Sequence, residues 1–194
     1  MRRRGVLLLA PALLAGCGLS ERPYAERRDW PMLVRRPTVL PPRPNGPVLE
    51  VRTLRAGPGL EARGLQTIEP DGSIHTAFYE EWSEPPAQGV EDALRQWLAA
   101  CGKFAAVVAP GSTMPADLVL EGELTALWSE LAAGRADAAV SVVVVRQGSA
   151  TPQIVLQRTE TATAPLAGRT PPDQVAAQLA ALATVFGKIE AALG

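Results

Sequence analysis

Residues 117–128 read DLVLEGELTALW, and the alternation along this stretch decides the fold class. One side of the alternation carries the apolar positions Leu118, Leu120, Gly122, Leu124, Ala126 and Trp128. The other side carries Glu121, Glu123 and Thr125, with Val119 and Leu127. A period of two is typical of a strand with one packed face and one wetter face. The stretch therefore predicts a long strand in a sheet that is covered on one side.

Further strands and two helices are predicted around this stretch. Short apolar runs bounded by Gly and Pro predict strands at 48–54, 60–68, 74–82, 104–108, 138–145 and 154–163. Apolar residues at spacings of three and four predict helices, which begin at about Pro86 and at Pro171-Pro172. This order predicts an α+β fold, a two-layer sandwich of one largely antiparallel sheet of six to seven strands with two amphipathic helices.

The N-terminus resembles a bacterial lipoprotein signal peptide. Arg2, Arg3 and Arg4 precede an apolar run at 6–14, which is too short to span a bilayer. The string Leu14-Ala15-Gly16-Cys17 follows it. Residues 1–16 are therefore expected to be removed and Cys17 to carry acyl chains that anchor the protein in a membrane. The alternative is an ordinary cleaved secretory signal that happens to contain a cysteine.

Residues 17–46 are expected to form a lipidated cysteine followed by a Pro-rich tether. Prolines at this density exclude a helix or a central strand and favour extended polyproline II. About 30 such residues reach roughly 90 Å when fully extended and about 30 Å as a coil. Alternatively, Trp30–Val34 docks on the folded body as a short edge strand. Residues 47–194 are predicted to form the folded domain.

Composition excludes several classes of function. Without residues 1–16 the chain has 178 residues, with 16 basic and 20 acidic side chains, which argues against nucleic acid as a partner. His75 is the single histidine, so neither a metal site nor a cofactor is expected. If Cys17 is acylated, Cys101 has no intrachain partner, and it is expected to be buried and inert or to pair between chains.

No convincing catalytic group emerges. His75 is expected to be a half-exposed strand residue, and Glu80 and Glu81 point to opposite faces of their strand. Glu121 and Glu123 share a face, which a solvated sheet surface explains. A hydrolase that depends on Glu121 or His75 is the least favoured hypothesis, and we expect no enzyme.

Two tryptophans are the candidate contact residues. Trp82 and Trp128 each end a predicted strand, where a large ring often emerges from the core. An exposed apolar patch of this kind would contact a partner protein or an acyl chain. The alternative is that both rings seal the ends of the core.

The order of motifs resembles a known family. WSEPP at 82–86, the stretch from Leu94 to Phe104 with Gly102, and ADLVLEGEL at 116–124 resemble the ABC-type transport auxiliary lipoproteins, which include proteins like paraquat-inducible protein C. The resemblance covers Val48 to Gly194 together with the lipoprotein signal.

This resemblance implies an accessory role in lipid transport. It implies a non-enzymatic lipoprotein that docks a periplasmic substrate-binding protein of the mammalian-cell-entry (MCE) type, part of an ABC transporter, with phospholipid as a further contact. Gly18 follows Cys17 where an aspartate would signal retention in the inner membrane, so the outer membrane is expected. The alternative function is a lipoprotein regulator of a cell-wall synthase or of envelope assembly.

Overall fold

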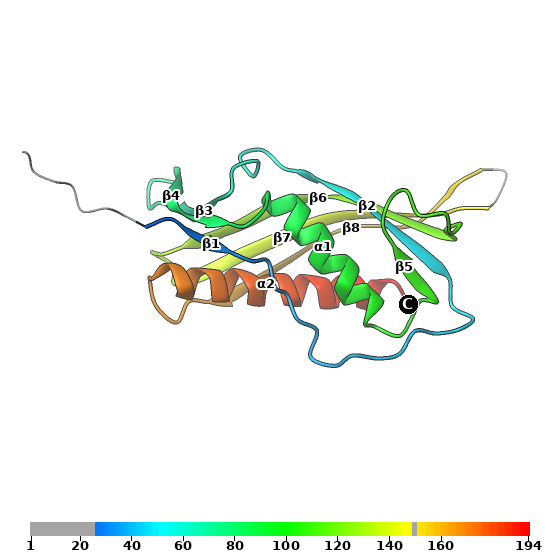
Figure 1. Ribbon diagram of the computed structural model, residues 1–194. Helices are drawn as coiled ribbons and strands as arrows, with labels where there is room; N and C mark the ends of the chain where they lie inside the picture. The colour runs from blue at the N-terminus through cyan, green and yellow to red at the C-terminus, as the bar shows by residue number, and fades with distance from the viewer. Residues whose placement is uncertain (1–25, 149–150) are drawn as a thin grey trace, which may run out of the picture.

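The structure is a computed structural model that describes residues 26–148 and 151–194. A single sheet is covered on one face by two helices (Figure 1). The predicted signal peptide and Cys17 lie outside the described residues. The α+β class and the pair of helices are as predicted.

Eight strands and two helices make up the described chain. The helices are α1 (Pro86–Ala99) and α2 (Pro171–Ala192), and both begin at the predicted prolines. The strands are β1 (Arg28–Trp30), β2 (Val48–Ala56), β3 (Gly64–Ile68), β4 (Ile74–Trp82), β5 (Ala106–Val108), β6 (Leu118–Glu130), β7 (Arg135–Arg146) and β8 (Gln153–Pro165). The strand that raises the count above the predicted six to seven is β1.

The sheet is mixed, so the prediction of a largely antiparallel sheet is wrong. The strands β6, β7 and β8 form an antiparallel meander, and β3 pairs antiparallel with β4. Parallel pairing joins β1 to β4, β2 to β5, and both β2 and β3 to β6. Hydrophobic periodicity shows which face of a strand is buried, but it carries no information on the direction of the neighbouring strand.

The strands β2 and β3 follow one another along the same edge of β6. β2 pairs with residues 118–124 of β6, and β3 pairs with Ser129 and Glu130. At the end of β2 the chain leaves the edge at Gly57, whose backbone N–H donates to the carbonyl oxygen of Leu124 at 2.8 Å. A Cβ on Gly57 would lie 2.7 Å from that oxygen, so only glycine fits this approach.

The core lies between the sheet and the helices. Leu120 and Leu124 of β6 are fully buried, as are Leu94 of α1 and Leu182 and Phe186 of α2. The rings of Trp97 and Phe186 meet edge to face, with their centroids 5.8 Å apart, and so join the two helices. By length and composition α2 could cross a membrane, but its apolar face packs in this core.

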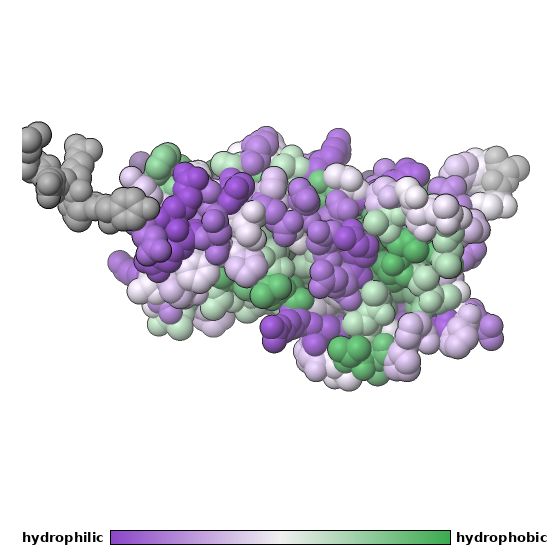
Figure 2. Space-filling model, in the orientation of Figure 1, coloured by the Kyte–Doolittle hydropathy of each residue, from purple (hydrophilic) through white to green (hydrophobic). Residues whose placement is uncertain are grey.

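The segment before β2 lies against the folded body. β1 pairs with β4 at the edge of the sheet, and Met32 and Val34 are buried in the core. Further along, the N–H of Leu40 donates to the carbonyl oxygen of Ala100 at 2.9 Å. Figure 2 shows a strongly polar surface beside the start of this segment. The alternative in which this segment docks on the folded body is therefore correct for residues 28–46. The edge strand begins at Arg28, two residues before the predicted start at Trp30, so the folded body begins near Arg28.

Candidate binding groove on the open face of the sheet

A groove of about 450 Å³ lies on the face of the sheet that the helices leave open. It runs across the ends of β3 and β6 and over β7 and β8. Its apolar lining includes Ile68, Ala126, Trp128 and Ala139, its threonines are Thr161 and Thr163, and its charged residues are Glu130, Arg135 and Asp137. The candidate contact residue Trp128 is therefore part of this groove.

A β-bulge places Trp128 on the open face. Leu124 pairs with Val140 and Ala126 pairs with Ala139, so Thr125 is an extra residue without a counterpart in β7. One extra residue swaps the two faces of a strand. Beyond the bulge Leu127 turns into the core, and Trp128 points the other way and is half-buried. The prediction that Trp128 shares a face with Leu120 and Leu124 is therefore wrong.

A buried hydrogen bond holds this orientation in place. Ser129 and Gln178 are both fully buried, and the side-chain amide of Gln178 donates to Ser129 Oγ at 3.0 Å. This bond ties the end of β6 to α2 on the side opposite the groove. Because breaking it would leave buried polar atoms unpaired, the side chain of Ser129 stays inward and that of Trp128 stays outward.

The charged side chains at one end of the groove form ion pairs with one another. Arg135 lies 2.7 Å from Glu130 and 3.2 Å from Asp137. The hydrogen bond with Asp137 is the main cause that raises the pKa of Arg135 above its usual range, and the nearby carboxylate charges add to it. With these charges paired, the groove offers an apolar floor and threonine hydroxyls. Such a surface suits an apolar side chain or an acyl chain better than an ionic ligand.

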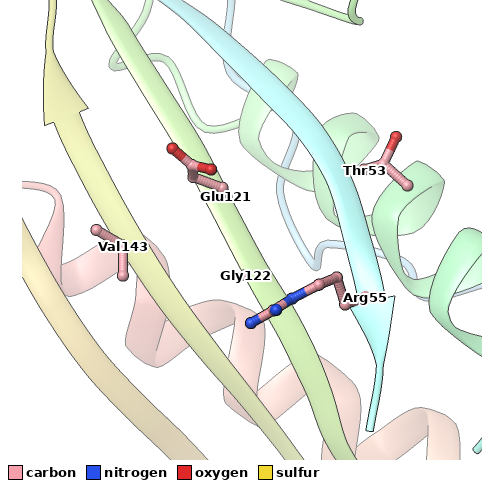
Figure 3. Close-up of a pocket in the computed structure, with 5 residues that line it drawn as sticks. All are labelled: Thr53, Arg55, Glu121, Gly122 and Val143. Atoms are coloured by element: carbon pink, nitrogen blue, oxygen red, sulfur yellow. The ribbon is translucent and has the colours of Figure 1, made fainter.

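A second, more polar hollow of about 440 Å³ lies over β2, β6 and β7. It is lined by Thr53, Arg55, Glu121, Gly122 and Val143 (Figure 3). Glu121 is half-exposed and lies 3.9 Å from Arg52, while Glu123 lies 3.1 Å from Arg55. The two carboxylates predicted to share a face thus each face an arginine across β2 and β6. Ion pairs on a solvated sheet account for both.

His75 is not brought near these carboxylates. It is exposed on β4 and lies opposite Thr67 of β3, which in turn lies opposite Ser129 of β6. From Ser129 to Glu121 is eight residues along β6, or about 26 Å at the usual rise of a strand. Among the described residues no three His, Cys, Asp or Glu side chains gather in a way that could hold a metal ion.

Trp82 does not reach the surface, so the prediction that it contacts a partner needs correction. Only 1% of Trp82 is exposed. Thr76 and Glu81 of β4 pair with Gln66 and Gly64 of β3, so five residue steps on β4 span two on β3. The simple alternation breaks in this bulged part, and Trp82 turns into the core. For Trp82 the structure supports the alternative that the ring seals the core.

A polar cluster that the sequence did not predict joins three distant segments. The carboxylate of Glu190, near the end of α2, accepts two hydrogen bonds from the guanidinium of Arg36, both at 3.0 Å. It also accepts one from the indole N–H of Trp97 at 2.7 Å. Lys103 Nζ donates to the backbone oxygen of Glu190 at 2.6 Å. This Glu190 cluster fastens the docked N-terminal segment to both helices.

The cluster shifts the pKa of its carboxylate. The hydrogen bond from Arg36 is the main cause that lowers the pKa of Glu190. Nearby, burial raises the pKa of the Cys101 thiol, which is 3% exposed. Cys101 is therefore buried, as the first of the two alternatives predicts, and the raised pKa favours the thiol form.

Replacing Glu190 by glutamine should destabilise the protein by about 1–2 kcal/mol at neutral pH, because Arg36 and Trp97 lose a charged acceptor. The stabilisation from a carboxylate with a lowered pKa is complete above its unfolded-state pKa and is lost as the pH falls through the folded-state value. The variant should therefore lose less stability than the parent on acidification. Urea unfolding at neutral and acidic pH measures both effects, with the exposed Glu61→Gln as control.

A protein-family model matches most of the chain. The model of the family described as ABC-type transport auxiliary lipoprotein component matches residues 33–190. The chain belongs to this family. The resemblance noted at WSEPP and ADLVLEGEL is thus confirmed, and the match begins inside the docked N-terminal segment.

Solved structures share the fold of this auxiliary lipoprotein. An uncharacterized protein superposes with a TM-score of 0.69 at 14% identity, covering 87% of this chain and 99% of that one. Protein XCC0632 from Xanthomonas campestris gives 0.64 at 19% identity, covering 86% and 90%. The hypothetical protein CT253 from Chlamydia trachomatis gives 0.53 at 12% identity, covering 75% and 96%. No curated protein matches the chain significantly.

Proposed function

We propose that this auxiliary lipoprotein is a non-enzymatic component of an MCE-type lipid-transport system, which it docks at the outer membrane. Membership of the ABC-type transport auxiliary lipoprotein family over residues 33–190 is the observation that carries the proposal. The partner is the MCE-type periplasmic substrate-binding protein of an ABC transporter. The anchor is acylated Cys17, and Gly18 after it favours the outer membrane.

The protein acts by contact rather than by chemistry. In the part of the chain that the structure describes, Glu121 and Glu123 each face an arginine, and His75 lies apart from both. Charges arranged in this way hold a sheet surface together and leave no general base beside a nucleophile. The chain also belongs to a family of transport auxiliary components, which favours a role in binding rather than in catalysis.

The Trp128 groove is the proposed contact with the partner, and an apolar segment of the MCE-type protein is the proposed occupant. A half-buried tryptophan beside paired charges is the kind of anchor that dominates protein interfaces. Pairing along the free edge of β8 is hindered at one point, because Lys188 Nζ donates to the backbone oxygen of Thr161 at 2.5 Å. A partner is therefore expected to bind through side chains in the groove rather than by adding a strand.

The docked N-terminal segment sets how far the domain stands from the membrane. Eight residues lie between Cys17 and Glu26, the first described residue. Even fully extended, this length of chain reaches only about 30 Å. The proposed contact surface therefore stays close to the bilayer that holds Cys17, and the partner has to span the periplasm to meet it.

Photo-crosslinking in living cells tests this proposal. A photoreactive amino acid at Thr163, on the groove, should capture an MCE-type or ABC component that mass spectrometry identifies. The control position is Gln96, which is exposed on α1. Capture from Gln96 alone would reject the groove but keep the function. Failure to recover any transport component from either position would count against the function, and recovery of a cell-wall synthase would favour the alternative.

A further inference from the structure

The bulged part of β4 carries exposed aromatic residues that the core and the Trp128 groove do not use. Phe78 is 68% exposed and Tyr79 is 47% exposed, and Ile74 on the same strand is 48% exposed. The two rings meet edge to face, with their centroids 4.9 Å apart. We call these three exposed side chains of β4, Ile74, Phe78 and Tyr79, the β4 patch.

Among residues 26–148 and 151–194, none pairs with the outer edge of β4 where this patch lies. On one side β4 pairs with β3, and on the other side β1 covers only Glu80–Trp82. Five residue steps on β4 span two on β3, so the segment that includes Phe78 and Tyr79 departs from regular pairing. An open strand edge with exposed aromatic side chains normally needs a partner.

The start of the described chain lies at the β4 patch. The guanidinium of Arg27 sits 5.4 Å from the centre of the Phe78 ring. Figure 1 shows the chain entering the fold at the end where β3 and β4 lie, and Figure 2 shows an apolar spot over this hairpin. Because only eight residues stand between Cys17 and Glu26, a lipid on Cys17 is within about 30 Å of the start of the described chain, beside Phe78.

We propose that the β4 patch is a second membrane contact, which rests in the interface of the same bilayer that holds the acylated Cys17. This inference depends on the lipid anchor of the proposed function. Aromatic side chains with a polar tip or a cationic neighbour favour the level of the lipid headgroups. Two contacts fix the orientation of a domain on the bilayer, which a flexible lipid anchor alone does not.

The charges around the patch favour a neutral lipid surface. Arg27 lies 3.5 Å from Glu81, and Arg28 lies 3.3 Å from Glu80. Since both of these described arginines face carboxylates, their charge is largely compensated and contributes little attraction for anionic headgroups. The contact is therefore apolar, and zwitterionic phosphatidylcholine is a sufficient probe.

A polarity-sensitive fluorophore on the full-length acylated protein tests the inference. Thr76→Cys carries the label beside the patch, and Gln153→Cys carries it at the opposite end of the sheet, both in a Cys101→Ala background. In phosphatidylcholine vesicles the label at 76 should emit at shorter wavelength and be quenched by spin-labelled lipid. The label at 153 should remain in water.

A pair of variants separates the patch from the anchor. Phe78→Ser with Tyr79→Ser should return the label at 76 to a watery environment while the protein stays bound to vesicles through Cys17. The matched change Ile154→Ser with Val155→Ser, exposed apolar residues of β8, should leave the label at 76 in lipid.

Three outcomes would overturn the inference, and they can be told apart. Equal exposure of both labels to water would show that the patch stays off the bilayer. Protection of the label at 76 in detergent micelles, together with a dimeric mass, would assign the patch to a second copy of the chain. Loss of the protein from vesicles altogether would refute the anchor, and with it the proposed function on which this inference rests.

Discussion

Replacing Cys17 by serine is expected to move the protein from the membrane fraction to the soluble fraction. Several acyl chains at about 0.8 kcal/mol per buried methylene hold a protein on a membrane almost permanently. A serine at position 17 carries no thiol to acylate. The β4 patch alone is too small to replace the anchor, so release should be nearly complete. Partition between detergent and aqueous phases measures the change, and intact mass measures the loss of the lipid.

The chain supplies its own control for this experiment. Cys101 is the other cysteine, and it is buried beneath the docked N-terminal segment. Cys101→Ala should stay in the membrane fraction with its lipid, at a modest cost in stability. If Cys17→Ser still partitioned into detergent with an unchanged mass, the anchoring argument would fail.

Replacing Trp82 by alanine is expected to cost about 3–5 kcal/mol of folding free energy. The ring is fully buried in the core beside the docked segment, and its removal leaves a large cavity where β4 meets the rest of the fold. A loss of this size is a large part of the stability of most domains. Urea unfolding followed by circular dichroism measures it.

Trp128→Ala is the matched variant. Its ring is half-buried on the open face, so its loss should cost clearly less stability. It should instead reduce crosslinking from Thr163 to the partner. Similar free-energy losses for the two variants would show that Trp128 also serves the core, and that the groove is not a free surface.

The sequence predicted where elements lie better than how they are arranged. Both helices begin at the predicted prolines, because a proline pair stops a strand and suits a helix start. The alternation of apolar residues over 117–128 correctly predicted a strand. It could not show the bulge at Thr125, because the bulge depends on pairing with β7. The sequence therefore placed Trp128 on the wrong face of the sheet.

Features that depend on long-range contacts escaped prediction. Direction of pairing between β2, β3 and β6 leaves no trace in periodicity, so the mixed sheet was missed. The Glu190 cluster joins Arg36, Trp97 and Lys103, and no local spacing links these positions. The Pro-rich composition suggested a free spacer, whereas Met32 and Val34 supply buried side chains that hold the segment against the body.

The docked N-terminal segment determines how the protein bears tension. A pull between the lipid anchor and a bound partner enters the described chain at Glu26, and β1 with its hydrogen bonds to β4 resists it first. Residues 31–47 come next, fastened by the Arg36–Glu190 ion pair. Only when this segment peels away does the load reach β2 and the centre of the sheet. Peeling would release about 20 residues, or roughly 65 Å of extra chain. It would take Met32 and Val34 out of the core, but the strands from β2 onward would stay paired while the envelope stretches.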